Sequence, residues 1–366
     1  MYAPDSPAHQ GDSPPPPDSL PRGLVLPHAM LDPRNDRQAM IPVAYPDLYE
    51  WYLKARDSFW TPEELTLTDD RRHWEERLGD DERHFIKLVL AFFATSDFIV
   101  NENLARSFAA QVTVPEARLF YNFQSAMEDI HSIMYARLLE AYVADTAERA
   151  GLLAAVDTVP AIAAKAAWAR RWIRDGTFLE RLVAFAVVEG VFFSASFCAI
   201  FWLKSKGLMP GLASSNELIA RDEGLHRDFA CHLYTGHTRP EERLARAGVL
   251  AIVDEAVALE QEFVRTALPV GLIGMNADLM CRYVRVVADH LLRSLGEEPA
   301  EPTPANPFPF MDAICLDTKT NFFEGRVTSY RKAVGRDAGQ GQGQGQGSGP
   351  VSVSVSADGV MYGCDF

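Results

Sequence analysis

The sequence predicts an all-α protein in which long helices form one bundle. Apolar residues recur with a helical period over long segments, and the alternating patterns that would indicate strands are nearly absent from the central part of the sequence. Hydrophobic residues make up 48% of the 366 residues, which is enough to fill a substantial core. The expected helices cover residues 81–112, 115–144, 178–206, 214–236, 240–267 and 274–296.

Composition divides the sequence into three parts. Residues 1–30 contain four consecutive prolines among Ser, Asp and Gly, so this segment cannot pack a core and is expected to be disordered. Residues 31–333 form the helical domain. Residues 334–366 contain a Gly-Gln repeat, typical of a flexible linker, and end in apolar and acidic residues. Such an ending is typical of a docking peptide, although the ends of a protein are commonly frayed.

Charge and cysteine content exclude several classes of protein. A net charge of −15 argues against a nucleic-acid-binding surface, which would be basic. Five scattered cysteines without a C-x-x-C pair indicate neither a disulfide framework nor a cysteine-zinc site, and they fit a reducing cytosol. The first residues lack the basic and apolar regions of a secretory signal. We therefore expect a cytoplasmic protein that binds no nucleic acid.

One segment has the length of a membrane span. Residues 182–203 carry a single charge, Glu189, and are long enough to cross a bilayer. A buried helix of a large soluble bundle is equally apolar on all sides. A carboxylate at that depth needs a partner, and a metal ion would provide one. We therefore expect a core helix and no association with a membrane.

Two copies of Glu-x-x-His carry the chemistry, and each follows a single upstream acid, by 31 residues in the first half and 34 in the second. Positions i and i+3 share a helix face, so each motif presents a carboxylate and an imidazole to one point. Four carboxylates balance two divalent cations, as in di-iron and di-manganese helical bundles. The six predicted metal ligands are Asp97, Glu128, His131, Glu189, Glu223 and His226.

The segments around these ligands closely resemble the small, radical-generating subunit of class I ribonucleotide reductase, of the eukaryotic and large-DNA-virus type. The resemblance runs from about residue 31 to residue 334 and resumes at the last residues. The segments that carry it are Ser96-Asp-Phe-Ile-Val-Asn-Glu-Asn-Leu104, Ala126-Met-Glu-Asp-Ile-His-Ser-Ile-Met-Tyr135, Val188-Glu-Gly-Val-Phe-Phe193 and Ser215-Asn-Glu-Leu-Ile-Ala-Arg-Asp-Glu-Gly-Leu-His226.

This resemblance implies a ferritin-like helical bundle with a di-metal carboxylate site that holds two iron ions. Manganese suits a site of carboxylates and two imidazoles as well, and the residues alone do not separate the two metals. The resemblance also implies a homodimer and a large catalytic subunit as partner. The last residues, Cys364-Asp-Phe366, resemble the C-terminal peptide that docks on that subunit.

Four further residues acquire roles through the same resemblance. Tyr135, four residues after His131, would be oxidised to a stable radical beside the metals. Trp60 and Asp222 would form a hydrogen-bonded link to His131, because metal-bound histidines usually donate their other N–H to a carboxylate. Tyr330 would carry the oxidising equivalent across the interface with the large subunit.

Neighbouring residues fit these roles with less specificity. Phe193, Phe197 and Ile219 match the family's apolar pocket around the radical, although a Phe stripe alone is more often plain core. Arg221 is expected to orient Asp222. A role for Tyr362, which also lies in the tail, stays open.

The expected function is therefore that of the small subunit of ribonucleoside-diphosphate reductase. No G-x-G-x-x-G or P-loop motif appears, which agrees with nucleotide chemistry on a separate large subunit. One alternative is an iron-binding or regulatory paralogue that makes no radical, and Tyr135, Trp60, Asp222 and Tyr330 argue against it. The other is a di-iron oxygenase with its own substrate, which the C-terminal peptide disfavours.

Overall fold

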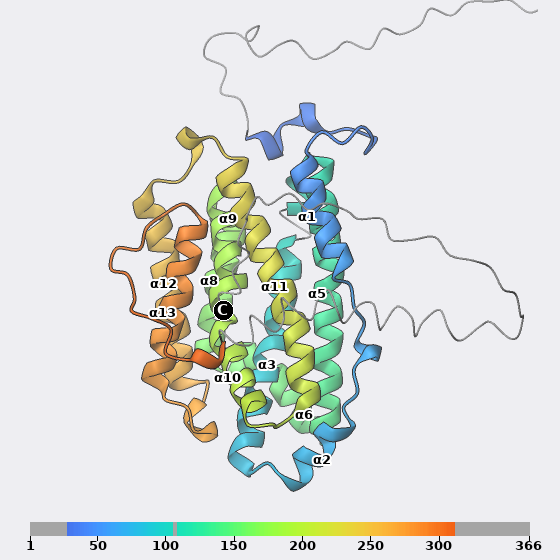
Figure 1. The fold of residues 1–366 in the computed structure, drawn as a ribbon, viewed down its shortest axis with the longest axis vertical. Helices are drawn as coiled ribbons and strands as arrows, with labels where there is room; N and C mark the ends of the chain where they lie inside the picture. The colour runs from blue at the N-terminus through green and yellow to red at the C-terminus, as the bar shows by residue number, and fades with distance from the viewer. Residues whose placement is uncertain (1–27, 105–107, 312–366) are drawn as a thin grey trace, which may run out of the picture.

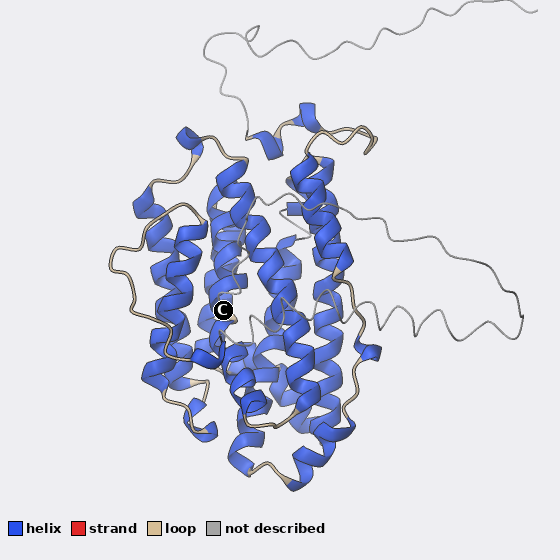
Figure 2. Ribbon diagram, in the orientation of Figure 1, coloured by secondary structure: helices blue, strands red, loops and turns tan. Residues whose placement is uncertain are grey.

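The computed structural model describes residues 28–104 and 108–311, and the regular elements in those ranges are all helices (Figure 2). The α-helices are α1 (Pro46–Asp57), α2 (Thr68–Glu76), α3 (Asp80–Asn103), α4 (Ala109–Gln111), α5 (Pro115–Tyr142), α6 (Thr146–Leu153), α7 (Ala155–Thr158), α8 (Pro160–Asp175), α9 (Phe178–Val187), α10 (Ser194–Ser205), α11 (Pro210–Gly236), α12 (Arg246–Thr266) and α13 (Ala277–Ser294). A π-helix, η6 (Val188–Phe192), connects α9 to α10. Short 3-10 helices are η2 (Ala29–Leu31), η3 (Pro33–Asn35), η4 (Pro62–Glu64), η7 (Pro240–Glu242) and η8 (Val270–Ile273). The all-α prediction is confirmed.

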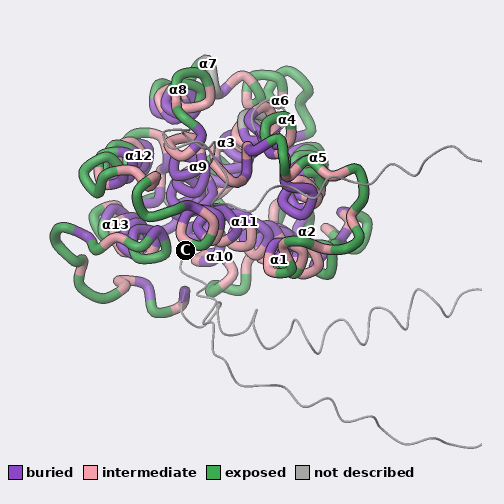
Figure 3. Tube along the Cα trace, turned by 90° about the horizontal axis from the view of Figure 1, so that it is seen from above, coloured by how far each residue is buried: buried purple, intermediate pink, exposed green. Residues whose placement is uncertain are grey.

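The long helices run side by side in one bundle (Figure 1). On one side α3 packs against α5, and α1 covers another face of α5. Towards the other side α9 packs against α11, and α12 contacts α8, α9 and α13. The view from above shows buried segments gathered along α9, α10 and α11 in the middle of the molecule (Figure 3). Many residues of α5 and α11 are buried, among them the glutamates and histidines of both Glu-x-x-His motifs.

The segment Met209-Pro210-Gly211 forms the start of α11. Pro210 lies in the first turn, where its missing N–H is not needed, and Met209 before it has φ 49°, in the left-handed region. Asp70 of α2 accepts hydrogen bonds from the backbone N–H groups of Gly211 and Leu212 at 2.6 and 2.7 Å. This carboxylate caps α11 from a neighbouring helix and fixes the helix that carries the second Glu-x-x-His.

Other boundaries differ from the prediction in ways that local sequence explains only in part. The helix predicted at 81–112 ends at Asn103, and the one predicted at 178–206 contains η6, so its backbone is not one regular α-helix. The helix predicted at 240–267 begins at Arg246, after η7. Helices α1, α2, α6 and α8 lie in the predicted helical domain but were not delimited from the sequence.

The apolar segment that could have crossed a membrane lies at the centre of the bundle. Phe178–Ser205 is long and apolar enough for a span, yet 94% of its most apolar 18-residue window is buried inside the protein. Neighbouring helices α8, α11, α12 and α13 contact this segment. The burial is that of a core helix, as the sequence predicted.

The two ends of the protein lie outside the described residues. Residues 1–27 contain most of the segment predicted to be disordered, and residues 312–366 contain the predicted linker, the docking peptide and Tyr330. The division at 30 and 333 therefore stays a prediction, and the structure describes the central domain as far as residue 311.

Candidate metal centre

Three helical segments bring five of the six predicted ligands to one buried place. Helix α5 supplies Glu128 and His131, α11 supplies Glu223 and His226, and η6 supplies Glu189. Their exposed fractions range from 0 to 2%, although carboxylates and imidazoles are seldom so deeply buried. The i, i+3 spacing in α5 and α11 places each Glu and His on a single face, as expected.

The sixth predicted ligand, Asp97, belongs to α3, which packs against α5. The backbone of this residue is part of the helix, and its side chain lies outside the described atoms. Its role as a ligand therefore remains a prediction.

The ligand atoms converge closely enough to share a cation. Single ligand atoms of Glu128, Glu189, Glu223 and His226 all lie within 4.8 Å of one another. Nδ1 of His226 lies 3.0 Å from Oε1 of Glu128 and 2.9 Å from Oε2 of Glu223. Nδ1 of His131 lies 3.4 Å from Oε2 of Glu128 and 3.2 Å from Oε1 of Glu223. Both imidazoles therefore direct the same ring nitrogen at the same two carboxylates.

The electrostatics of the cluster favour positive charge at its centre. Burial would lower the pKa of His226, but the adjacent carboxylates of Glu128 and Glu223 raise it to about 9. Burial opposes protonation of His131 as well, but attraction to Glu223, the hydrogen bond with Asp222 and the nearby carboxylate of Glu128 raise its pKa well above the usual value. The two imidazoles outweigh burial at Glu223 and lower the pKa of its carboxyl. The carboxylates therefore stabilise positive charge next to the two imidazole rings, at the place where a metal cation would bind.

The residues present fit a divalent metal. Among the residues that the structure describes, both carboxylate oxygens of Glu128 and Nδ1 of His131 are buried without a partner in hydrogen-bonding geometry. A buried polar atom left unsatisfied costs about 1–3 kcal/mol, so several of them at one point indicate a ligand. Carboxylate oxygens with imidazole nitrogens are donors that iron and manganese accept. A cation between these atoms would satisfy all of them.

The predicted connection between Trp60 and His131 is present. Oδ2 of Asp222 accepts a hydrogen bond from Nε1 of Trp60 at 2.7 Å and lies 3.2 Å from Nε2 of His131. The two rings are nearly parallel, with an interplanar angle of 21°. Burial would raise the pKa of Asp222, but Arg221 and His131 lower it, and Nη2 of Arg221 donates to Oδ1 at 2.9 Å. A continuous series of hydrogen bonds therefore leads from the cluster to Trp60.

Tyr135 lies one helical turn beyond His131 and is fully buried. Its ring stacks on Phe93 at a centroid distance of 4.8 Å and an interplanar angle of 3°. Phe93 contacts Phe197 and Phe193 in turn, at 5.0 and 5.7 Å. The hydroxyl of Tyr135 donates to Oδ1 of Asn216 at 3.4 Å. The ring of Phe93 thus covers the phenol, the two predicted pocket residues Phe193 and Phe197 pack against Phe93, and Ile219, the third, is buried as well.

Sequence reasoning missed three residues of this region. Gln124 donates from Nε2 to Oε1 of Glu189 at 3.1 Å, and its position four residues before Glu128 is the helical signal that points to it. Phe93 lies four residues before Asp97 and carries the same signal. Asn216 lies seven residues before Glu223.

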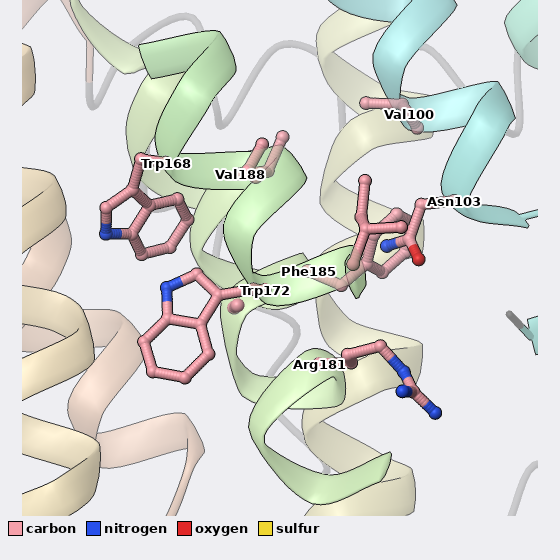
Figure 4. A pocket seen from close by; sticks show the side chains of 10 residues that line it. Val100, Asn103, Trp168, Trp172, Arg181, Phe185 and Val188 are labelled. Atoms are coloured by element: carbon pink, nitrogen blue, oxygen red, sulfur yellow. The ribbon is translucent and has the colours of Figure 1, made fainter. Parts of the chain in front are cut away.

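Two other features of the surface and core lie elsewhere. A mainly apolar pocket between α3, α8 and α9 is lined by residues that include Trp168, Trp172 and Val188 (Figure 4), and the five described ligands are not among them. A half-buried cluster joins α1 to the end of α11, where Oδ2 of Asp47 lies 2.8 and 2.6 Å from the Nε2 atoms of His232 and His237. These hydrogen bonds satisfy that carboxylate without a metal.

Comparison with known proteins gives one consistent family. A family model for the ribonucleotide reductase small chain matches residues 37–307. The ribonucleoside-diphosphate reductase small chain of Nicotiana tabacum is 55% identical over 312 residues, covering 85% of this sequence and 93% of that protein. The small chain of Trypanosoma brucei brucei is 55% identical over 305 residues, covering 83% and 89%.

Solved structures agree with the sequence comparison. The Rnr4 homodimer of ribonucleotide reductase from Saccharomyces cerevisiae has a TM-score of 0.72 at 33% identity, and the match covers 83% of this protein and 93% of that one. Dimanganese(II)-NrdF of Streptococcus sanguinis has a TM-score of 0.68 at 18% identity, covering 75% and 97%. The second likeness concerns the fold alone.

Proposed function

The chain belongs to the ribonucleotide reductase small-chain family, and from this premise we propose how its residues serve the reductase. It is the small subunit of a ribonucleoside-diphosphate reductase, with the predicted ferritin-like bundle and a di-metal carboxylate site. The observation that carries the proposal is the buried convergence of three glutamates and two histidines beside a fully buried tyrosine.

We propose that the site holds two iron ions through Asp97, Glu128, His131, Glu189, Glu223 and His226. The donor atoms suit manganese too, so metal analysis of the purified protein must decide between iron and manganese. When bound, the metals would supply the oxygen activation needed to oxidise the phenol of Tyr135 by one electron with loss of its proton. The protein residues orient the donors, exclude water and keep the oxidised phenol away from reductants.

Tyr135 is suited to store an oxidising equivalent because its surroundings offer little that could quench a radical. Its ring is covered by Phe93, and Phe193 and Phe197 extend the aromatic enclosure. Solvent does not reach the side chain, which has 0% exposure. A phenoxyl radical in such a place would be kept from reductants dissolved in the solvent.

We propose that Trp60, Asp222 and His131 form the start of the path by which the oxidising equivalent leaves the site. The hydrogen bonds through Asp222 hold the indole of Trp60 in a fixed place relative to His131. Arg221 keeps Asp222 in place, and also donates from Nη2 to the backbone carbonyl of Ser58 at 2.6 Å. Tyr330 would continue the path to the large subunit.

The partners follow from this role. We propose that the protein forms a homodimer, acts in the cytoplasm and docks on a large catalytic subunit through its C-terminal residues 359–366. A Gly-rich tether of about 30 residues reaches roughly 30 Å, so the terminal peptide could find a pocket while the bundle is loosely held. Phe366 would be the buried anchor, and Asp365 with the terminal carboxylate would give charge complementarity.

Deleting residues 359–366 tests this proposal. The truncated protein should bind metal as the full-length protein does but should lose association with the large subunit and, with it, ribonucleotide reduction. A synthetic peptide of the same eight residues should compete with the full-length protein. Unchanged association of the truncated protein, measured by analytical ultracentrifugation, would show that the tail is only a frayed end.

A further inference from the structure

A lysine and a glutamate that have no place in the proposed metal chemistry form a buried ion pair next to the π-helix. Lys165 of α8 is 3% exposed and Glu260 of α12 is 0% exposed. Nζ of Lys165 lies 2.5 Å from Oε2 of Glu260, and the same Nζ donates to the backbone carbonyl of Phe192 at 2.7 Å. Phe192 is the last residue of η6, the segment that carries Glu189.

The pair acts at the junction between two kinds of helix. In a π-helix each N–H bonds to the carbonyl five residues earlier, and in an α-helix four residues earlier, so the ladder must change register where η6 meets α10. Lys165 donates to the backbone carbonyl of Phe192 on the η6 side of this junction, and its ammonium is held there by the carboxylate of Glu260. Nearby, the hydroxyl of Ser194 donates to the carbonyl of Val191 at 2.7 Å.

Aromatic rings enclose the ammonium group. Nζ of Lys165 lies 3.8 Å from the ring centroid of Phe92 and 4.2 Å from that of Phe263. One turn further along α8, Trp168 packs edge-on against Phe192 at 5.1 Å. Figure 4 shows Trp168 close to the turn that carries Val188, the first residue of η6. The contacts of Lys165 and Trp168 from one face of α8 therefore meet at Phe192, the last residue of η6.

Stability does not explain why charges are placed here. Burial lowers the pKa of Lys165 to about 8 and raises that of Glu260 in spite of their pairing. Replacing a buried ion pair by apolar residues of similar volume is often neutral or stabilising, whereas removing one partner costs about 3–5 kcal/mol. A buried ion pair that adds little net stability but holds a backbone carbonyl at this junction is suited to defining a conformation.

We propose that Lys165 and Glu260 are positioning residues that hold η6 in its π-helical register and so place the carboxylate of Glu189 at the metal site. Without them the segment would relax towards a regular α-helix, and every residue after the change would rotate about the helix axis. This inference rests on the proposed assignment of Glu189 as a ligand.

Two variants and a matched control test the proposal. Lys165→Met removes the ammonium donor with little change in length, and it leaves Glu260 as an unpaired buried charge. The double variant Lys165→Met with Glu260→Leu removes both charges and should keep the thermal stability of the full-length protein. Arg37→Met is the control, because Arg37 pairs with the buried Glu116 at 2.6 Å, at the start of α5 and away from η6.

The readouts are hydrogen exchange and metal affinity. In the chelated full-length protein, amide exchange in residues 188–196 should speed up at least tenfold in both variants and stay unchanged in Arg37→Met. Ferrous or manganous ion should bind at least tenfold more weakly to the double variant at unchanged melting temperature. Wild-type exchange and metal affinity in the double variant would overturn the proposal.

The two proposals can fail separately. If Glu189→Ala binds metal as the wild type does, the ligand assignment fails, while the exchange of residues 188–196 still tests the role of the ion pair. If Glu189→Ala loses metal and the double variant does not, Glu189 is a ligand that needs no such support.

Discussion

The two halves of the metal site share a sequence pattern but not a backbone. In the first half the Glu-x-x-His lies on α5 and the upstream acid on α3, a regular α-helix at that position. In the second half the Glu-x-x-His lies on the regular α11, but the upstream acid, Glu189, belongs to a π-helix. Ligands in a repeated sequence pattern can thus be presented by different backbone geometries. Here the difference between the halves lies at the carboxylate of Glu189.

The histidines of the two halves also differ, in the residues that contact them. His131 in the first half is connected outward, through Asp222, to Trp60. His226 in the second half packs edge-on against Phe120, at 6.3 Å between ring centroids. The first half is therefore connected to the buried Trp60, whereas the second half carries its upstream acid, Glu189, on a π-helix.

Of the changes considered, removal of Glu189, the ligand on the π-helix, should have the largest effect, and it should act on metal content. Glu189→Ala should lower the metal content of the purified protein by at least one ion per subunit, measured by atomic emission spectrometry. Asp47→Asn is the control, because it alters the other cluster of an acid with two histidines and should leave metal content unchanged. Two tightly bound ions in Glu189→Ala would remove the second-half acid from the ligand set.

The hydrogen-bonded link from His131 through Asp222 to Trp60 should matter for turnover. Trp60→Phe removes the N–H that Asp222 accepts and a readily oxidised ring, so turnover with the large subunit should fall by at least an order of magnitude while metal binding persists. Trp51→Phe is the matched control, because Trp51 is also buried but packs on Phe229 and His232, which are not among the predicted ligands or the Trp60 link. Equal turnover of the two variants would place the route elsewhere.

Proton release should give a smaller effect that reports on both histidines. Metal ligation needs neutral imidazole, and in the cluster His226 has its pKa raised to about 9, so metal binding at pH 7 displaces a proton from it. Calorimetry at pH 7 in buffers of different ionisation enthalpy should show this release, and the release should diminish above pH 9. A proton count of zero at pH 7 would contradict the assigned charges.

The same shift predicts how the metal-free protein responds to pH. A folded-state pKa raised above the unfolded value of about 6.5 stabilises the fold fully below that pH, and the contribution is lost as pH rises through about 9. Chelated protein should therefore unfold at lower denaturant concentration at pH 9.5 than at pH 6. Saturating metal should remove most of that difference.

Much of the site could be predicted from the sequence because helical spacing fixes which residues share a face. The pairs Glu128 with His131 and Glu223 with His226 follow directly from i, i+3 geometry, and the structure brings them together. The π-helix at Glu189 could not be predicted, because a change in hydrogen-bond register depends on contacts from other helices.

The supporting residues were hidden for a related reason. Lys165 and Glu260 are 95 residues apart, and neither stands in a recognisable motif. The capping of α11 by Asp70 spans 141 residues, so the segment at Met209 resembled an ordinary turn. Local pattern predicts what one helix presents, whereas contacts between helices decide how its ends and irregular turns are held.

The central claim is that this buried cluster loads metal and oxidises Tyr135. The most direct test is the electron paramagnetic resonance spectrum of the full-length protein after ferrous iron and oxygen are added. The account predicts a tyrosyl radical signal in the wild type, and its loss in Tyr135→Phe with metal content unchanged. A wild-type protein that binds two iron ions and shows no such signal, or a Tyr135→Phe variant that keeps it, would contradict the account.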